Sequence, residues 1–253
     1  MKWPFQRTPL EKQLEQMRAD WDRRARANAR HFILTGRDEW GDGDFFASGR
    51  ETVKEQILSD MTNICQGKAA DRMRVLEIGC GAGRVTRALA DVFGEVHAVD
   101  VSGEMVEQAR VSLARFPNAH VYLNSGMDLR VVPELPFDFA FSFIVFQHIP
   151  SHDIVEGYLS EVHRLLRPGG LFKFQVNGVP NRRVMGGYRP LRRGPDTWLG
   201  APITDEDATR MAVRTGFDCR YRIGAETQYF WLWFFKNGGG RKENRRFRIQ
   251  RPT

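Results

Sequence analysis

Cysteine is scarce in this sequence, and the few cysteines stand far apart. Only three occur, Cys65, Cys80 and Cys219, and no Cys/His cluster has the spacing of zinc ligands. An odd number of isolated cysteines is typical of proteins from a reducing compartment. The sequence therefore predicts no bound metal.

Long apolar runs are missing as well. The longest, YFWLWFF at residues 229–235, is far shorter than the roughly 18 residues that a membrane-spanning helix needs. The first residues, MKWPFQRTPLEKQLEQ, lack the apolar core of a signal peptide. We therefore expect a cytoplasmic protein without a membrane partner.

Acidic residues are outnumbered by basic ones, but the excess is confined to one end of the chain. The formal net charge is +7, and residues 236–253 hold seven Lys or Arg and one acid, Glu243. A nucleic-acid enzyme is expected to carry its basic residues along a groove of the folded body. We therefore expect no nucleic-acid partner and interpret residues 237–253 as a solvated basic tail.

The first 67 residues are predicted to form helices and a cap loop. Residues 10–34 contain no Gly or Pro and repeat apolar residues at spacings of three and four, which indicates an amphipathic helix. Residues 35–49 are rich in Gly and Asp and are interpreted as a loop, followed by a second helix over residues 50–67.

Strand-like and helix-like runs alternate over residues 68–236, which predicts one α/β domain with a parallel sheet and crossover helices. The last two strand-like runs are separated by only a few residues and are expected to form an antiparallel hairpin at the sheet edge or just inside it. The predicted fold is a doubly wound, Rossmann-like, seven-stranded and mostly parallel sheet with an antiparallel C-terminal hairpin. Its strands are expected at residues 74–79, 95–101, 119–125, 137–145, 170–176, 217–224 and 227–236.

Residues 178–203 break this alternation and are interpreted as an insertion that forms a lid over the substrate. Its arginines could bind an acceptor that bears a carboxylate or phosphate, or the segment could be a solvated basic loop, and the sequence leaves both open. The candidate substrate-binding residues are Arg182, Arg183, Arg189 and Arg192.

The stretch VLEIGCGAGRVT, residues 75–86, places three glycines where a strand turns into a helix. Such a turn, with a ligand against its backbone, leaves no room for Cβ atoms. The dinucleotide fingerprint G-x-G-x-x-G requires a third glycine where this sequence has Arg84. The loop therefore fits a pyrophosphate poorly.

Two carboxylates, Glu77 and Asp100, end adjacent strand-like runs and are expected at the carboxyl edge of the sheet. Asp100 suits a ribose, because a carboxylate can accept hydrogen bonds from both vicinal hydroxyls. Glu77 would repel a pyrophosphate but attract an ammonium or sulfonium group. Nicotinamide and adenosyl cofactors both carry a ribose for Asp100, so it is Glu77 that favours a cationic nucleoside ligand over a nicotinamide dinucleotide.

Three segments, VLEIGCGAGRVTRALA, VHAVDVSGEMVEQAR and LLRPGGLFKF, together resemble the class I S-adenosylmethionine-dependent methyltransferases. The resemblance runs over residues 74–176 and more weakly through the closing hairpin. It implies S-adenosyl-L-methionine as cofactor, with Asp100 on the ribose, and Val101 and Met105 beside the adenine. The residues that it places at the cofactor are Glu77, Gly79, Cys80, Gly81, Gly83, Asp100, Val101, Met105, Gly126, Met127, Asp128 and Phe143.

Asp128 and Cys80 have alternative interpretations. In many members of the family an acid directly follows the glycine that matches Gly126, whereas Asp128 comes one residue later, so it could equally be a turn residue. Cys80 is interpreted as a small residue tolerated in the loop, without nucleophilic chemistry.

The end of the fourth strand, SFIVFQHIP, is where the reacting groups are expected to collect. His148 is the candidate general base there, because an imidazole titrates near neutrality. The alternative is that His148 caps the following turn or packs beneath the cofactor. This strand end also lacks the Asp/Asn-Pro-Pro-aromatic motif of amine methyltransferases that act on nucleic-acid bases.

The sequence thus predicts methyl transfer by in-line displacement to a small-molecule acceptor. Two alternatives remain: a catalytically inactive cofactor-binding scaffold or sensor, and an NAD(P)-dependent reductase. The acceptor, its reacting atom, the oligomeric state and the role of the basic tail stay open.

Overall fold

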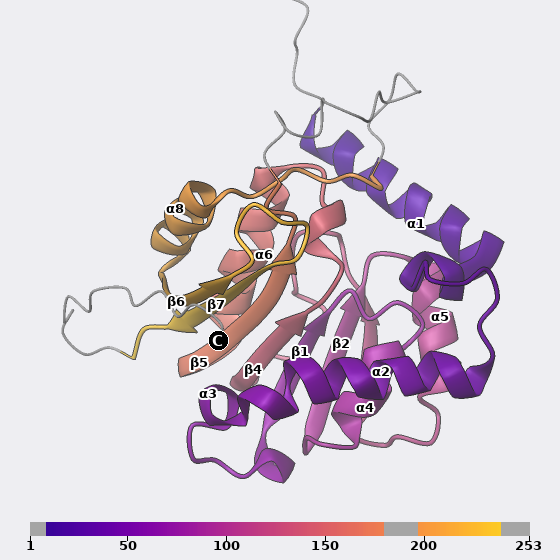
Figure 1. Cartoon of the computed structure of the whole chain (residues 1–253), viewed down its shortest axis with the longest axis horizontal. Coiled ribbons are helices and arrows are strands. Elements are labelled where there is room, and N and C mark those ends of the chain that lie inside the picture. The colour runs from indigo at the N-terminus through magenta and orange to yellow at the C-terminus, as the bar shows by residue number, and fades with distance from the viewer. Residues whose placement is uncertain (1–8, 180–196, 239–253) are drawn as a thin grey trace, which may run out of the picture.

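A seven-stranded sheet forms the centre of the molecule (Figure 1), in a computed structural model that describes residues 9–179 and 197–238. The strand order is β3-β2-β1-β4-β5-β7-β6, and only β7 runs antiparallel to its neighbours. The predicted mostly parallel sheet with an antiparallel closing pair is confirmed. The strands are β1 (Arg74–Ile78), β2 (Glu95–Asp100), β3 (Ala119–Leu123), β4 (Phe137–Ser142), β5 (Leu166–Val176), β6 (Phe217–Ile223) and β7 (Phe230–Lys236).

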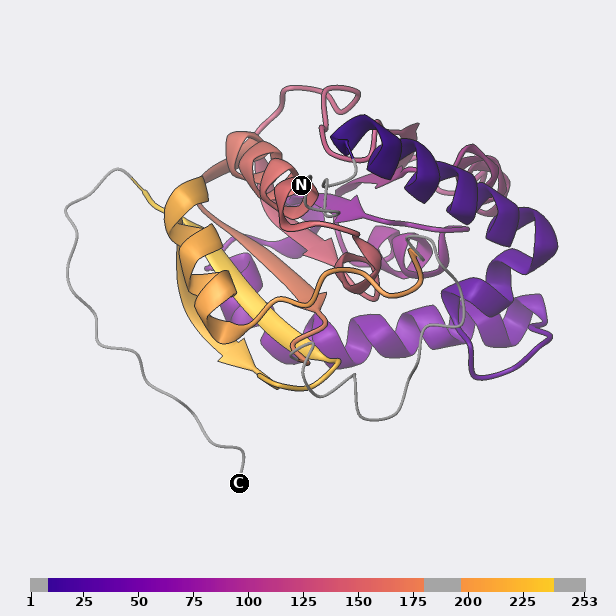
Figure 2. The ribbon, with the colours of Figure 1, turned by 90° about the horizontal axis from the view of Figure 1, so that it is seen from above.

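Helices cover both faces of the sheet (Figure 2), because successive strand residues present apolar side chains to opposite sides. One face packs against α6 (His152–Leu165) and α8 (Asp205–Thr215). The other packs against α2 (Asp42–Gln56), α3 (Met61–Cys65) and α4 (Arg84–Ala90), while α5 (Gly103–Ser112) covers the β2–β3 end. Short 3-10 turns lie at Leu58–Asp60, Ala70–Arg72 and Phe146–His148.

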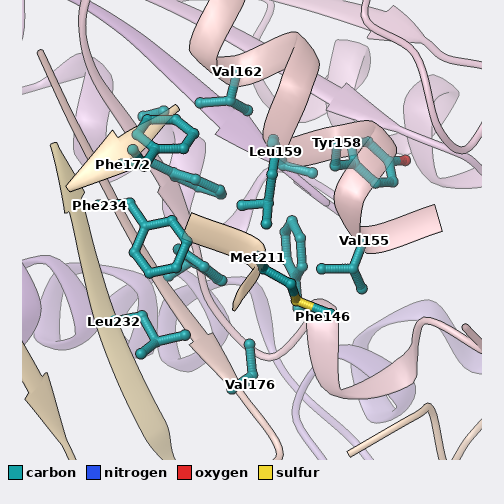
Figure 3. Close-up of a cluster of buried hydrophobic side chains, with 14 of the residues drawn as sticks. Phe146, Val155, Tyr158, Leu159, Val162, Phe172, Val176, Met211, Leu232 and Phe234 are labelled. Carbon is teal, nitrogen blue, oxygen red and sulfur yellow. The ribbon is translucent and has the colours of Figure 1, made fainter. Parts of the chain in front are cut away.

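The core beneath α6 shows how the apolar stripe of a helix packs against the apolar face of a strand (Figure 3). Val155, Leu159 and Val162 recur at helical spacing and bury one stripe of α6. Phe172 and Phe174, two residues apart on β5, present their rings to this side with centroids 4.3 Å from each other. This packing fixes the end of β5 and the chain that follows β4.

The N-terminal region differs from the prediction in one respect. Residues 35–49 are not one loop, because α2 begins at Asp42 and buries Phe45 and Phe46. Gly49 allows α2 to approach α4 closely, since a Cβ atom there would stand 2.0 Å from the carbonyl oxygen of Arg84. Gly49 therefore serves helix packing rather than a turn. The expected helix over residues 50–67 is divided, since α2 ends at Gln56 and α3 starts at Met61.

The predicted first helix is present as α1 (Leu10–Ile33), with non-helical backbone at Asn28. The amide of Asn28 donates to the Asp38 carbonyl, and its side-chain oxygen accepts from the His31 backbone N–H, which supports the last turn. Within the two described stretches, no helix has both the length and the apolar character to cross a membrane.

Candidate functional site

The glycine loop between β1 and α4 is fastened to the end of β2. Gly79 and Cys80 both donate their backbone N–H groups to the Val99 carbonyl, at 2.8 and 3.0 Å. Gly79 has a φ of +75°, and a Cβ atom there would lie 2.3 Å from the side chain of Val145. A side chain is thus excluded both by the backbone conformation and by the residue that follows β4.

A cleft opens at the carboxyl ends of β1, β2 and β4, with about 860 Å³ of unoccupied space that continues into solvent. This is the edge at which open α/β sheets bind ligands. Nine of the predicted site residues line it: Glu77, Gly79, Cys80, Gly81, Asp100, Val101, Met105, Phe143 and His148. The sequence interpretation had not assigned the other lining residues to the site, among them Met17, Trp21, Phe32, Ile33, Arg84 and Tyr158.

Glu77 is a buried carboxylate with one unsatisfied oxygen. Its Oε2 accepts no hydrogen bond from any described residue. Burial raises the pKa of Glu77 to about 7, and the neighbouring Thr86 hydroxyl and Arg84 guanidinium oppose the shift. Leaving a buried charged acceptor without a partner is costly. The carboxylate therefore suits a ligand that brings a cationic hydrogen-bond donor.

Arg84 is held away from Glu77 by helix α2. Its Nη1 donates to the Thr52 hydroxyl at 3.0 Å and to the Ser48 hydroxyl at 3.4 Å. Burial lowers the pKa of the Arg84 guanidinium to about 10, and the charge of Glu77 opposes this shift. Arg84 thus anchors the start of α4 to α2, beneath the cleft.

Asp100, at the end of β2, is braced by the loops on either side. Its Oδ2 accepts from the Gly81 N–H at 2.8 Å and its Oδ1 from the Ser102 N–H at 2.9 Å. Burial raises the pKa of Asp100 to about 6, although these backbone hydrogen bonds lower it. Because a carboxylate has about four acceptor positions, two remain for a ligand with vicinal hydroxyls.

Helix α1 covers this part of the cleft, and we call this cover the α1 roof. Asp22 accepts a hydrogen bond from the Ser102 hydroxyl at 2.6 Å, and Arg26 pairs with Glu104 at 2.8 Å. The side chain of Ile33 lies so close to Gly81 that a Cβ atom there would meet it at 2.7 Å. The roof therefore rests directly on the glycine loop.

His148 belongs to a chain of hydrogen bonds with a defined direction. The Ile144 N–H donates to Gln175 Oε1 at 3.0 Å, and Gln175 Nε2 donates to Gln147 Oε1 at 3.0 Å. Gln147 Nε2 then faces His148 Nε2 at 3.1 Å, and His148 Nδ1 faces the Trp198 carbonyl at 2.6 Å. Since an amide nitrogen and a carbonyl have fixed roles, His148 carries its proton on Nδ1 and accepts at Nε2.

Residues 197–199 are fastened to α1 beside this chain. The Thr197 hydroxyl donates to Asp20 at 2.8 Å and accepts from Arg24 at 3.0 Å. The Arg24 guanidinium lies 4.9 Å from the Trp21 ring centre and 5.3 Å from that of Trp198. An aromatic wall thus joins α1, His148 and the segment before α8.

Ile144, two residues after the end of β4, adopts a left-handed conformation with a φ of +57°. A β-branched residue rarely does so, because its side chain clashes with its own backbone in this region. The Gln175 side chain holds the Ile144 N–H in place. Such strain is concentrated at functional sites, and here it lies on the cleft wall.

The remaining predicted residues lie outside the cleft lining or outside the described part of the chain. Asp128 accepts from the Ser125 hydroxyl at 2.7 Å and from the Arg130 N–H at 3.2 Å, which is the arrangement of a turn residue. Gly126 packs beneath Met17 of α1. Gly83 and Met127 also lie off the lining, and Arg182, Arg183, Arg189 and Arg192 fall outside the described residues.

Comparisons of the sequence point to one kind of protein. A family model described as a methyltransferase domain matches residues 75–170. Trans-aconitate 2-methyltransferase of Azoarcus sp. (strain BH72) is 32% identical over 164 residues, which cover 63% of this chain and 58% of that protein. Malonyl-(acyl-carrier protein) O-methyltransferase of Salmonella typhimurium is 37% identical over 165 residues, with the same coverage of 63% and 58%. The chain thus matches less than two thirds of either relative's length.

Solved structures share the overall fold. Haemonchus contortus phosphoethanolamine N-methyltransferase 1, in complex with phosphoethanolamine and S-adenosylhomocysteine, superposes with a TM-score of 0.67 at 16% identity, over 94% of this chain and 52% of that one. The magnesium protoporphyrin IX methyltransferase from Synechocystis PCC 6803 gives 0.61 at 16% identity, over 88% and 99%. At such identities the likeness establishes the fold.

Proposed function

We propose that this chain, which belongs to the class I S-adenosylmethionine-dependent methyltransferases, binds S-adenosylmethionine in the cleft and transfers its methyl group to a small-molecule acceptor. The observation that carries the proposal is the position of Glu77. Glu77, whose Oε2 accepts no hydrogen bond from any described residue, lines the same cleft as Asp100 and the glycine loop. A buried carboxylate, Glu77, and a partly buried one, Asp100, beside one loop suit a ligand with an ammonium, a sulfonium and a ribose.

The residues present fit this cofactor in both charge and shape. We assign Glu77 to the ammonium group, Asp100 to the ribose hydroxyls, and Val101 with Met105 to the adenine. A pyrophosphate in the same place would meet the Glu77 carboxylate as a like charge in a partly desolvated cleft, which disfavours the NAD(P)-dependent alternative. When bound, S-adenosylmethionine supplies an electrophilic methyl group.

The acceptor is expected at the end of the cleft formed by α1 and the chain after β4. In-line displacement asks the protein chiefly to align the acceptor and to exclude water. Trp21, Phe32, Val145 and Ile149 provide apolar walls there, and the α1 roof shields the loop. We therefore propose an acceptor with an apolar or aromatic face. A carboxylate or phosphate on it, bound by the arginines of residues 180–196, remains a prediction.

The hydrogen bonds of His148 favour a positioning role for this residue. Its Nδ1–H holds the Trp198 carbonyl, and its Nε2 accepts from Gln147. A general base would need Nε2 directed at the acceptor instead. We propose that His148 secures residues 197–199 against α1 and thereby shapes the acceptor wall.

The activity is tested by incubating the protein with S-adenosylmethionine labelled in the methyl group and a panel of carboxylic acids, phenols, quinols and amines. The expected result is transfer to one chemical class, lost in the Asp100→Ala variant. Binding of S-adenosylhomocysteine without transfer to any compound, in the full-length chain, would favour the inactive scaffold.

A further inference from the structure

We propose that Glu95, His97 and His120 form a binding site for a divalent transition-metal ion, with Zn²⁺ as the preferred occupant. The three residues lie on β2 and β3, away from the cleft lining. Glu95 precedes Asp100 by five residues along β2, or about 17 Å at the rise of a strand. The proposal is thus independent of the proposed methyl transfer.

The pairing of the strands brings the three side chains together. His97 lies directly opposite His120 in the parallel β2–β3 register, and Glu95 stands two residues before His97, on the same face of the sheet. Glu95 Oε1 is 2.9 Å from His97 Nε2 and 3.7 Å from His120 Nε2. One donor atom from each residue lies within 4.8 Å of the others.

These separations are close to those of a metal site. Ligands about 2.1 Å from a tetrahedral Zn²⁺ lie about 3.4 Å from one another, so small side-chain rotations suffice. Two imidazoles and one carboxylate are a donor set suited to Zn²⁺ and related ions of intermediate softness. Three protein ligands leave the fourth position to water.

The neighbours of the cluster supply the outer contacts that metal ligands require. Arg74 Nε binds Glu95 Oε2 at 2.7 Å, which orients the carboxylate and leaves Oε1 directed at the histidines. Tyr122 Oη lies 3.0 Å from His97 Nδ1, and the planes of the two rings are nearly parallel, at 2° to each other. Metal-bound histidines usually have such a partner on the second nitrogen, which fixes the ring orientation.

The contact with Tyr122 is compatible with both states of His97. Without metal, Nε2 donates to the Glu95 carboxylate, so Nδ1 of the neutral ring accepts from the Tyr122 hydroxyl. With metal on Nε2, the ring proton moves to Nδ1 and is donated to the Tyr122 oxygen. The ring stays neutral throughout, because one proton changes nitrogen and none is lost.

The exposure of the ligands allows an ion to enter. The His97 side chain is only 3% exposed, whereas those of His120 and Glu95 are 42% and 31% exposed. An ion can therefore reach the site from the solvent side and be held against a rigid inner ligand. A metal there would link β2 to the edge strand β3, so its expected effect is on stability.

The test is calorimetric titration of the full chain, without an affinity tag, with ZnCl₂ near pH 7.5. We expect one ion per chain, binding at least about 10-fold weaker in Tyr122→Phe, and weaker still in His120→Ala and His97→Gln, since outer-shell contacts alone are worth 10–100-fold. His163→Gln, on α6, is the matched control with unchanged affinity. Zn²⁺ should raise the Tm of the unaltered chain and not that of His120→Ala.

His120→Ala keeps the test decisive, because this partly exposed side chain can be removed without opening the core. Absence of saturable binding by the unaltered chain would overturn the proposal. So would an affinity equal in His120→Ala and the unaltered chain, which would indicate adventitious binding elsewhere. Binding of S-adenosylhomocysteine should be unaffected by EDTA, and its loss would contradict a site remote from the cleft.

Discussion

The half of the cleft proposed for the cofactor and the half proposed for the acceptor are assembled in different ways. The cofactor half comes from a short stretch of chain in which the glycine loop, Glu77 and Asp100 are placed by the turns of two adjacent strands. The acceptor half joins α1, the residues after β4 and residues 197–199, which meet only through tertiary contacts. Under the proposed function, a local motif binds the cofactor while the distant segments determine the acceptor.

The glycine loop should tolerate change least. Gly79→Ala places a Cβ atom against Val145 at a positive φ, so we expect a loss of about 3 kcal/mol in the free energy of unfolding. Gly43→Ala is the control, because this glycine of α2 has open space and the change should stabilise by about 0.5–1 kcal/mol. Urea denaturation compares the two, and equal effects would contradict the close packing of the loop.

We expect the Glu77 carboxylate to lower the stability of the ligand-free chain and to strengthen ligand binding. Its pKa is raised to about 7 from the ordinary 4.5, so the folded chain binds the proton more tightly and loses stability as pH rises from 4.5 to 7. Glu77→Gln should therefore stabilise the ligand-free chain at pH 8, by at most about 3 kcal/mol. The same variant should bind S-adenosylhomocysteine at least about 10-fold more weakly, because it lacks the charge-assisted hydrogen bond.

Denaturation at pH 5 and pH 8, together with calorimetry, measures both effects of Glu77→Gln. Asp128→Asn is the matched control, since Asp128 bonds within its own turn, and its affinity should be unchanged. A Glu77→Gln variant that binds S-adenosylhomocysteine as tightly as the unaltered chain would contradict the assignment of the Glu77 charge to the ammonium group.

Substitution of His148 should affect the reaction with the acceptor and leave cofactor binding unchanged. In His148→Asn we expect kcat/KM for the identified acceptor to fall by about 10-fold, with an unchanged affinity for S-adenosylhomocysteine. A general base contributes typically 10²–10⁴-fold, and its removal would also abolish the acidic limb of the pH–rate profile. An unchanged profile supports positioning, whereas a lost limb would show that His148 acts as a base.

The smallest effects belong to the α1 roof. Ser102→Ala removes both the N-cap of α5 and the contact with Asp22, and should cost about 1 kcal/mol in the free energy of unfolding. Arg26→Ala breaks an exposed ion pair with Glu104 and should change stability by less than about 0.5 kcal/mol. If both substitutions were neutral in urea denaturation, the roof would be only loosely attached.

The sequence predicted the sheet, and it named nine residues that line one cleft, for identifiable reasons. Strand and helix periodicities are local, and the glycines that follow β1 mark the turn at which a ligand is expected against the backbone. The amphipathic pattern of α1 indicated a buried face but not its partner, so Trp21 and Phe32 were not assigned to the cleft. Residues 42–49 were wrongly interpreted as loop, because Gly49 serves contact with α4 rather than a turn.

The acceptor half was less predictable because its geometry depends on long-range hydrogen bonds. The position of His148 at a strand end was foreseen, but nothing near it in sequence indicates Trp198 or Gln175 as its neighbours. The same is true of Glu95, His97 and His120, since their proximity follows from strand register and not from the spacing of a metal motif.

The central claim is that the cleft is built for an adenosyl ligand with a cationic amino-acid part. Calorimetric titration of the unaltered chain with S-adenosylhomocysteine and, separately, with NADH tests it most directly. We predict saturable binding of one S-adenosylhomocysteine per chain and no detectable heat from NADH. Tight binding of NADH with no response to S-adenosylhomocysteine would contradict the account.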